Sequence, residues 1–494
     1  MVYSASVQGY VEPCGCTGEP LGGIARFKAV VDDVRQAFGA RVIVLDAGDL
    51  LFEKLDDDGA VDRCQAEART ELLVSSYARA GLVATTRGPL DDVRGRGFRD
   101  QLLLKHGVAS VDHGAALVVV RGGYRVLIIG VDDNDDAALV ADAVAREPHD
   151  AVLVLAQMSA KQAVARAALW PGVDVVVVGR AAAAPLAPVR SGDAVVVSAG
   201  WQGQYAGVLT LHLDQRQAGA PLALRDEASA EARKRLLDVR VLELDRLLAA
   251  LPEGAPKTFQ QDRRDKFAAE RATLAAVDDV VAPTVPTLVV QALPLKRGMA
   301  EEAEALRALT SYERSIPLLV GQCEKGVTCP EPTEGSAHFV GAATCKACHA
   351  EAFATWQLAL VDVTATNKDG SKSTHKSGHS VAWPTLVSAG RDKDRSCIGC
   401  HSAGFDVAGG ACTTTLLLSK ELTGVQCESC HGAGSLHVQG GGDASKIRRL
   451  VDESVCRGCH VPPHIESVSS FVYEERVLKI LGAGHRRRPL QELP

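Results

Sequence analysis

Four copies of the pentapeptide Cys-x-x-Cys-His occur in the last third of the chain, and they end at His349, His401, His431 and His460. In this pattern the two thiols can add to the vinyl groups of a porphyrin, while the histidine binds the iron on one axial side. Zinc knuckles also contain paired cysteines, but they do not need a histidine after every second cysteine. The repeated pattern therefore predicts four covalently bound c-type haems and a redox protein.

The predicted attachment residues follow directly from these motifs. They are Cys345, Cys348, Cys397, Cys400, Cys427, Cys430, Cys456 and Cys459. Each motif also supplies one proximal histidine, so the open question is the second axial ligand of each iron. None of the three methionines lies in 336–494, which excludes methionine ligation, and the higher potential it gives, within this region.

Spare histidines are the remaining candidates for the second axial position. Those in the haem region are His338, His375, His379, His437, His464 and His485. Six candidates for four irons favour haems with two histidine ligands and a low reduction potential.

The other six cysteines are Cys14, Cys16, Cys64, Cys323, Cys329 and Cys412. Covalent haem attachment takes place outside the bacterial cytoplasm, where disulfides also persist. We therefore expect Cys323 and Cys329 to form a small disulfide loop. Cys14 and Cys16 are compatible with a strained disulfide, a soft-metal site shared with Cys64, a reactive dithiol or an ordinary structural pair. The sequence leaves these alternatives open and does not predict the remaining pairings.

Length and composition limit the class of protein. At 494 residues, of which 46% are hydrophobic, the chain is long enough for two or three domains with conventional cores. The net charge of −7, to which haem propionates would add, gives no reason to expect nucleic-acid binding. No apolar run approaches the roughly eighteen residues that a membrane-spanning helix needs. The first ten residues lack the basic and apolar regions of an export signal, so we expect that signal to be missing from this sequence.

The sequence pattern divides the chain into three parts. Residues 1–218 contain short apolar runs such as YRVLIIGVDD and VDVVVVGR, separated by helical stretches, which predicts an α/β fold with buried strands. Residues 219–335 contain three amphipathic segments and one probable strand, TLVVQALPL, and are expected to form a helical connector. Residues 336–494 hold the haem motifs and are expected to be mostly helical or irregular.

Flanking residues of the motifs add a resemblance. The stretch LTGVQCESCHGAGSLH, preceded by CIGCHSAGF and GHSVAWPTL, resembles the tetrahaem cytochrome c family of nitrifying bacteria. That family stacks its haems in close pairs and takes distal histidines from elsewhere in the fold. Carried onto this sequence, the resemblance pairs three proximal histidines with three distal ones: His349 with His437, His431 with His379, and His460 with His485.

The same resemblance implies that the haem on His401 has an open axial position. This sequence departs from the family pattern in two ways. His375 and His464 are additional histidines that could fill the open position, and the insert DVTATNKDGSKSTHK precedes His379.

A second resemblance concerns residues 1–218. The ordered segments SASVQGY, GGIAR, VLDAGD, VDVVVVGR and SAGWQGQYAG resemble the metallophosphoesterase domain of periplasmic 5′-nucleotidases and UDP-sugar hydrolases. The resemblance implies a β-sandwich with flanking helices. That family holds two metal ions through Asp-x-His, Gly-Asp, Gly-Asn-His-Glu, an isolated His and Gly-His-x-His. The matching positions here are Ser6, Gln8, Gly48, Asp49, Gly88, Pro89, Leu90, Asp91, Gln157, Gly179, Arg180, Ala181 and Ala182.

Most of that ligand set has been replaced. Two-metal hydrolysis needs several oxygen and imidazole ligands to hold both ions and activate water. Asp49 is the one metal ligand that survives, and a single carboxylate cannot hold two metal ions. We therefore expect no phosphoesterase activity and assign no catalytic residue.

These observations support one leading hypothesis and two alternatives. The leading hypothesis is a periplasmic, extracellular or outer-membrane-associated electron-transfer protein whose partners are other cytochromes or a quinol-linked donor. Its phosphoesterase-like domain would serve in docking or scaffolding. One alternative is a redox enzyme that acts on a small nitrogen or sulfur compound at an open haem on His401. The other is an active metallophosphoesterase with a redox module, which the missing ligands disfavour.

Overall fold

The computed structural model describes residues 1–12, 21–54, 59–217, 220–225, 237, 241–242, 244–246, 248–249, 255–275, 286–325, 327–366, 372–412, 420–460, 471–482 and 485. The chain forms two compact units. The first comprises Met1–Tyr10, Gly22–Leu55 and Val74–Leu295, and the second comprises Val11–Leu21, Asp56–Leu73 and Lys296–Pro494. Cys14, Cys16 and His464 lie outside the described residues, as does the side chain of His375.

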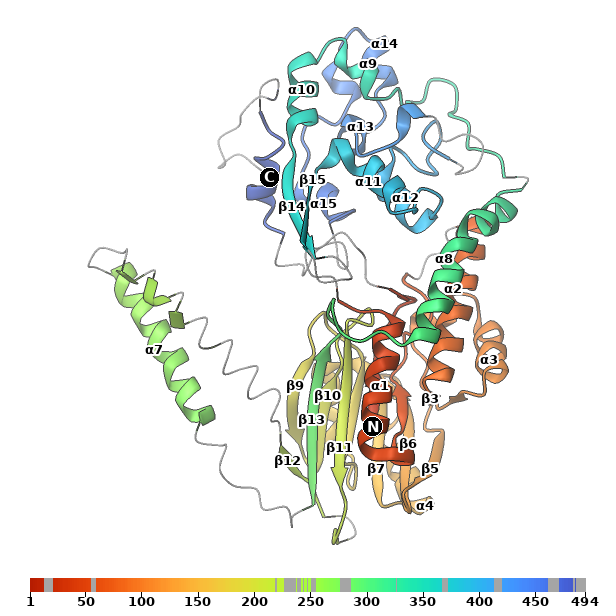
Figure 1. The fold of residues 1–494 in the computed structure, drawn as a ribbon, viewed down its shortest axis with the longest axis vertical. Coiled ribbons are helices and arrows are strands. Elements are labelled where there is room, and N and C mark those ends of the chain that lie inside the picture. The colour runs from red at the N-terminus through yellow and green to blue at the C-terminus, as the bar shows by residue number, and fades with distance from the viewer. Residues whose placement is uncertain are drawn as a thin grey trace. The chain divides into compact units, whose positions relative to one another are not determined.

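Two sheets form the framework of the first unit (Figure 1). The first has the order β12-β13-β11-β1-β2-β3-β4 and the second β5-β6-β7-β8-β10-β9. The strands of the first are β1 (Val2–Ser4), β2 (Val44–Asp46), β3 (Leu82–Thr85), β4 (Ala109–Ser110), β11 (Tyr205–His212), β12 (Ala223–Arg225) and β13 (Thr287–Pro294). Those of the second are β5 (Ala116–Arg121), β6 (Tyr124–Asp132), β7 (Ala151–Ser159), β8 (Val175–Arg180), β9 (Leu186–Ser191) and β10 (Ala194–Ser198).

The two sheets share one hydrophobic core. Leu45 of the first sheet and Leu153 and Val177 of the second belong to a single buried cluster. The opposite face of the second sheet packs against two helices through a separate apolar cluster. The helices and 3₁₀ turns of this unit are α1 (Ile24–Phe38), η1 (Gly39–Arg41), η2 (Pro89–Asp92), α3 (Arg96–Lys105), α4 (Ala137–Arg146), α5 (Ala160–Ala167) and α7 (Ala255–Ala275). Helix α2 (Gly59–Arg79) is divided: its residues up to Leu73, with Cys64 and Gln65, belong to the second unit, and those from Val74 belong to the first. The expected sandwich with flanking helices is therefore confirmed.

Strand β13 is the predicted TLVVQALPL strand, but it does not belong to a helical connector. It pairs antiparallel with β11 from Tyr205↔Pro294 to His212↔Thr287. The first unit consequently extends to Leu295, and the two compact units divide the chain differently from the expected boundaries at 218 and 335. Local periodicity predicts that a strand exists but not which distant strand it joins. The predicted helix at 229–251 falls mostly outside the described residues.

Short helices and one hairpin make up the second unit. They are α8 (Ala303–Cys323), α9 (Ala342–Lys346), α10 (Ala350–Leu358), β14 (Val361–Thr366), β15 (Lys372–Ser377), η3 (His379–Val381), α11 (Ala382–Ser388), α12 (Arg395–His401), η4 (Lys420–Leu422), α13 (Cys427–His431), α14 (Ser435–Gln439), η5 (Ala444–Lys446), α15 (Glu453–Arg457) and α16 (Tyr473–Val477). Its described apolar clusters are small, for example Ala403, Ala411 and Leu422. Among the described residues, no helix is both long enough and apolar enough to cross a membrane.

The expected disulfide between Cys323 and Cys329 is wrong. Cys323 pairs with Cys64, and Cys329 pairs with Cys412, with Cα–Cα distances of 6.2 and 5.6 Å. The reason is that α8 lies beside α2, so the last residue of α8 meets Cys64 rather than its neighbour in sequence (Figure 1). Proximity in sequence was therefore a poor guide to these pairings.

Candidate haem centre and former phosphoesterase centre

Each Cys-x-x-Cys-His motif lies in or beside one helical turn. The third motif is the whole of α13, and the second is the last part of α12. In the first motif, the backbone N–H of His349 donates to the backbone carbonyl of Cys345 at 2.9 Å. In the fourth, the N–H of His460 donates to the carbonyl of Cys456 at 2.8 Å. Residues three and four apart lie on one face of a helix. Each turn therefore brings both thiols and the imidazole toward one side, as attachment to a single porphyrin requires.

Backbone carbonyls orient two of the proximal rings. The Nδ1–H of His401 donates to the carbonyl of Ala382 at 2.9 Å, and that of His431 donates to the carbonyl of Arg448 at 2.7 Å. A carbonyl can only accept, so the proton is fixed on Nδ1 and Nε2 is left as the free metal-binding nitrogen. This arrangement is typical of metal-binding histidines.

Two pairs of imidazoles have the spacing of axial ligands. The ring centroids of His349 and His437 are 6.1 Å apart, and those of His379 and His460 are 6.0 Å apart. With a metal–nitrogen bond of about 2 Å, two imidazoles on opposite sides of one iron have centroids about 6 Å apart. His437 also donates its Nδ1–H to the carbonyl of Asp443 at 2.8 Å, which leaves its Nε2 free. The residues present therefore fit haem iron.

The pairing of the distal histidines differs from the expected one. We expected His379 beside His431, but it lies beside His460. We expected His485 beside His460, but the charges that lower its pKa, after burial itself, are those of His431 and His349. Among the described residues, the buried Nδ1 of His485 has no hydrogen-bond partner. His379 thus contacts the fourth motif rather than the third, because the sequence does not show which attachment turn η3 folds against. Which iron each distal histidine binds stays a prediction.

Contacts between thiols show how the motifs cluster. Cys427 of the third motif is near enough to raise the pKa of Cys345 of the first, and Cys400 of the second motif is near enough to lower the pKa of Cys459 of the fourth. Cys456 of the fourth motif is also near enough to raise the pKa of Cys430, to which burial contributes most. Neighbouring contacts therefore follow the order first, third, fourth and second motif.

Sequence inspection missed a buried carboxylate that joins the first and third motifs. Glu428 lies inside the third motif and is 2% exposed. Its carboxylate accepts the backbone N–H groups of Val340 and Gly341 at 3.0 and 2.7 Å, and that of Gly434 at 2.7 Å. Because the x positions of Cys-x-x-Cys-His are unrestricted, the motif gave no signal for this role.

The former phosphoesterase centre, defined here as Ser6, Asp49, Gln157, Gly179 and Arg180, is brought together by the fold. Ser6 donates its hydroxyl to the carbonyl of Gly179 at 2.5 Å, and Gln157 donates to the carbonyl of Ala47 at 3.1 Å. Ser6, Gln8 and Asp49 all have positive φ, which is uncommon for non-glycine residues. The loop conformations of a ligand-bearing site are therefore present, but the side chains bond to the protein.

Protein groups also compensate the charge of Asp49. Burial raises the pKa of this carboxyl, while a hydrogen bond from the Leu90 N–H at 2.9 Å, the charge of Arg180 and the amide of Gln157 lower it. A guanidinium and two N–H donors thus surround the carboxylate that would otherwise face cations. The described residues of this centre include no imidazole, so the site does not fit a pair of metal ions.

Two further aspartates hold the loops of the former centre. Asp91 is 1% exposed and accepts four backbone N–H groups, those of Asp49, Leu50, Leu51 and Gly88, at 2.8–2.9 Å. Asp46 accepts the hydroxyls of Ser4 and Thr85. Burial raises the pKa of Asp91 to about 7 and that of Asp46 to about 6. Both residues are structural rather than ligating.

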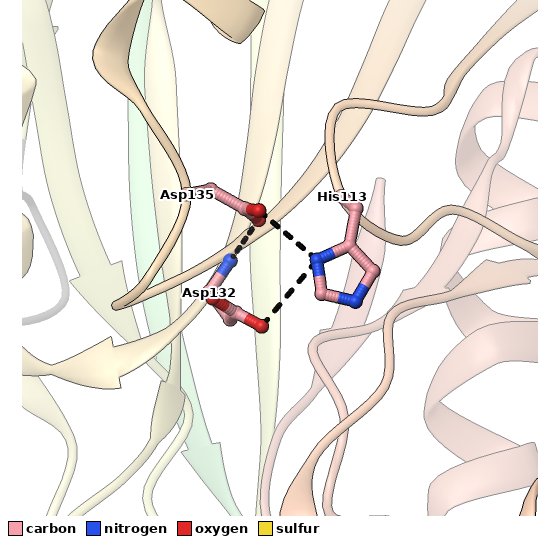
Figure 2. A group of neighbouring side chains, drawn as sticks. All are labelled: His113, Asp132 and Asp135. Carbon is pink, nitrogen blue, oxygen red and sulfur yellow. Dashed lines mark hydrogen bonds and ion pairs between the residues drawn. The ribbon is translucent and has the colours of Figure 1, made fainter.

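A group of possible metal ligands lies near this centre (Figure 2). The Nδ1 of His113 is 3.0 Å from Asp135 and 3.6 Å from Asp132. The guanidinium of Arg87 lies 2.7 Å from the Nε2 of His113 and must donate to it. This fixes the ring proton on Nδ1, where it bonds to Asp135. The group is accordingly explained as a network of ordinary hydrogen bonds.

Comparison with known proteins gives one family for the haem region. Residues 344–432 match the family described as cytochrome c554 and c-prime. This match covers the first three attachment motifs and supports the resemblance drawn from their flanks. No protein of curated function matches the chain.

Solved structures similar to the chain include a sulfate thiohydrolase and two nucleotidases. Sulfate thiohydrolase SoxB of Thermus thermophilus, in complex with glycerol, is 16% identical with a TM-score of 0.37, over 44% of this chain and 54% of that one. A 5′-nucleotidase precursor of Thermus thermophilus is 18% identical with a TM-score of 0.43, over 69% of this chain and 62% of that one. The NAD nucleotidase of Haemophilus influenzae is 13% identical with a TM-score of 0.42, over 69% of this chain and 63% of that one. The chain thus spans less than two thirds of each of these structures. It joins a region similar to 5′-nucleotidases to a cytochrome segment.

Proposed function

We propose that this protein transfers electrons through four c-type haems attached at its four Cys-x-x-Cys-His motifs. The observation that carries the proposal is the pair of imidazole spacings, 6.1 and 6.0 Å, each between a motif histidine and a histidine outside the motifs. A chance arrangement of histidines would not place two rings at the separation that one iron requires. Each bound haem would supply one reversible electron at its iron.

The chain's own residues would fix where each haem lies. The eight motif cysteines would hold the porphyrins covalently, and His349, His401, His431 and His460 would bind the irons. His437 and His379 would provide the second axial ligands opposite His349 and His460, and the position of His485 near His431 supports it as the third. The carbonyls of Ala382 and Arg448 orient two proximal rings.

The thiol contacts support an order for the relay. The first motif contacts the third, the third neighbours the fourth, and the fourth contacts the second. Electrons entering at the first or the second motif would therefore pass through the third and fourth. The partners would be other cytochromes or a quinol-linked donor. Two disulfides and covalent haem both favour a periplasmic or extracellular location.

The phosphoesterase-like unit would serve in docking or scaffolding rather than in hydrolysis. Its metal ligands are replaced by Ser6, Gln157 and Arg180, and these side chains bond to protein atoms. Its loop-supporting aspartates remain. The replacement of the metal-binding side chains, with the supporting loops kept, supports a structural role.

The mass of the intact denatured protein tests the proposal directly. We expect the polypeptide plus four haems, and a potentiometric titration should account for four electrons. Fewer than four haems in fully matured protein would contradict the proposed relay.

A second candidate function is reduction or oxidation of a small molecule at the haem on His401. Among the side chains that the structure describes, no histidine ring pairs with that of His401. An iron with one open axial face could bind a nitrogen or sulfur compound, or NO. Reduced protein titrated with CO would distinguish the two functions, because one equivalent per four haems supports the enzyme and none supports the pure carrier.

A further inference from the structure

The helix that carries the second attachment motif is held by a residue more than three hundred positions away. Gln65 in α2 is 4% exposed, and its amide contacts the first turn of α12 at two points. Its Nε2 donates to the carboxylate of Asp394 at 2.5 Å, and its Oε1 accepts the backbone N–H of Arg395 at 3.2 Å. Asp394 is the N-cap of α12, and it also accepts the N–H of Ser396 at 3.1 Å. One amide therefore holds both the cap and the first free N–H of this helix.

The charge of Asp394 is maintained although it is buried. Burial alone would raise the pKa of this carboxyl, but hydrogen bonds from Ser396 and Gln65 and the charge of Arg391 lower it below its ordinary value. Arg391 itself bonds to Asp394 at 2.8 Å, to Glu313 at 2.9 Å, and to Glu12. The cap is thus an ionised acceptor set in a network from four parts of the chain.

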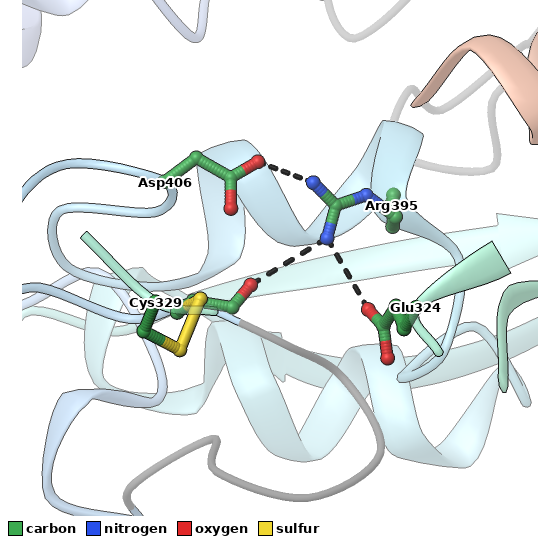
Figure 3. The surroundings of a disulfide bond; sticks show 5 residues. Glu324, Cys329, Arg395 and Asp406 are labelled. Atoms are coloured by element: carbon green, nitrogen blue, oxygen red, sulfur yellow. Dashed lines mark hydrogen bonds and ion pairs between the residues drawn. A yellow bond between two sulfur atoms is a disulfide. The ribbon is translucent and has the colours of Figure 1, made fainter. Parts of the chain in front are cut away.

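Arg395, the first residue of α12, is also fixed by several polar contacts (Figure 3). Its side chain is 5% exposed and forms ion pairs with Glu324 at 3.2 Å and with Asp406. It also donates to the carbonyl of Cys412 at 3.5 Å and lies 4.6 Å from the ring centre of Phe405. Removing one partner of such a buried pair leaves an uncompensated charge, which is why these contacts fix the position of the helix.

The contacts to α12 lie next to the disulfides in sequence. Gln65 follows Cys64, and Glu324 follows Cys323, the two cysteines of one disulfide. The carbonyl that accepts from Arg395 belongs to Cys412, which forms the other disulfide with Cys329. The covalent bonds therefore fix the very residues that hold the first turn of α12. Cys397, Cys400 and His401 follow within that same helix.

We propose that Gln65 and the Cys64–Cys323 disulfide are positioning residues for the haem bound at Cys397, Cys400 and His401. They act through Asp394 and Arg395 on the placement of α12, the helix that contains Cys397, Cys400 and His401. The first and third motifs have their own support in Glu428. Loosening the α2 contact should therefore disturb one haem of the four.

The test is a potentiometric titration of the holoprotein with Gln65→Leu, which keeps the side-chain size and removes both hydrogen bonds. His401→Met identifies the reduction step of the haem in question, because exchanging imidazole for a thioether raises the potential of that haem alone. We expect Gln65→Leu to shift the reduction potential of the haem that His401→Met identifies, and to change the electron paramagnetic resonance signal of that haem. The other three steps should coincide with those of the wild type. Gln101→Leu, on the exposed face of α3, is the matched control and should change nothing.

Rescue separates positioning from general stability. Gln65→Glu combined with Asp394→Asn exchanges the amide and the carboxylate at the same total charge, so that the hydrogen bond between the two side chains and the one from the Arg395 N–H can form again. The Oδ1 of Asp394 also accepts from Ser396, and an amide NH₂ in that place cannot. We therefore expect this pair to shift the potential part of the way back to the wild-type value, whereas Gln65→Glu alone, which opposes two carboxylates, should shift it further than Gln65→Leu. Cys64→Ser with Cys323→Ser should move the same step as Gln65→Leu.

The outcomes also separate this inference from the proposed function on which it rests. A wild-type mass with fewer than four haems would contradict the proposed function. Four haems with a Gln65→Leu titration identical to the wild type, or with a shift in another haem, would overturn the positioning role alone. A lowered melting temperature without a shifted step would overturn it as well. If Gln65→Leu fails to mature, Gln65→Asn, which is shorter by one methylene, provides the same comparison.

Discussion

Asp91 in the first unit and Glu428 in the second have the same structural role, although their surroundings differ in which ligand side chains are present. Both carboxylates are buried, and both accept several backbone N–H groups that belong to loops around the centre. Around Asp91 the residues expected to bind metals have been replaced. Around Glu428 all the cysteines and histidines of the motifs are present. The supporting framework is therefore independent of whether the ligands remain.

The two centres also differ in how their buried carboxylates are compensated. A buried carboxylate such as Asp49 costs free energy unless a cation or N–H donors compensate it. In the former phosphoesterase centre, the charge of Arg180 and the N–H of Leu90 compensate Asp49. In the second unit the buried carboxylate of Glu428 is compensated by backbone N–H groups alone, those of Val340, Gly341 and Gly434.

The largest effect should come from removing haem attachment in the middle of the relay. Cys427→Ser with Cys430→Ser should yield protein with three haems and slow electron exchange between the first haem and the rest, because the third motif lies between them. Cys397→Ser with Cys400→Ser should also yield three haems, yet the remaining three should equilibrate in one phase. Intact mass and stopped-flow absorbance measure both. Equal kinetics in the two variants would contradict the proposed order of contacts.

The next largest effect should fall on stability. Asp91→Ala leaves four buried N–H groups without their acceptor, and because each unsatisfied group costs about 1–3 kcal/mol before the loops relax, we expect a loss of about 3–5 kcal/mol. Glu428→Ala should cost a similar amount in the second unit. Denaturant unfolding of the holoprotein checks both, with Asp193→Ala in an exposed turn as the control, expected within about 0.5 kcal/mol. A small effect of Asp91→Ala would mean that the loops of the former centre do not depend on this carboxylate.

A smaller, local effect should follow from removing single distal rings. His437→Ala and His379→Ala should each convert one haem of four from low spin to high spin, because each removes one of the two imidazoles at an iron. Absorbance and electron paramagnetic resonance of the ferric protein report the change. The haem affected by His379→Ala should be the one attached at Cys456 and Cys459. If the haem at Cys427 and Cys430 changed instead, the ring contact between His379 and His460 would not represent ligation.

Local patterns predicted the attachment motifs and an α/β fold with buried strands, and the resemblance to metallophosphoesterases implied the sandwich. The spacing of Cys-x-x-Cys-His and the apolar runs of β6 and β8 are properties of short segments. The disulfides, the place of β13 in the sheet and the partner of His379 depend on contacts over long separations. Single-sequence periodicity carries no information about such pairings. Asp394 was predictable in part, since Asp-x-Ser before a helical turn is a capping pattern, but its contact with Gln65 was not.

The smallest effect is expected on hydrolytic activity, the property in which the former phosphoesterase centre should differ most from its family. Asp49→Ala should leave hydrolysis of nucleotides and UDP-sugars at the background level, with or without added Mn²⁺, Zn²⁺ or Co²⁺, because the wild type should already show none. The physical reason is that one carboxylate, already bonded to the Leu90 N–H and facing Arg180, cannot hold two ions and activate water between them. Arg180→His, which returns an imidazole but removes the compensating charge, is the sharper variant and should remain inactive for want of the other ligands. Metal-dependent turnover in the wild type that disappears in Asp49→Ala would show that the centre kept its chemistry with ligands other than those of its family. The two centres would then differ in ligand type rather than in the loss of a function.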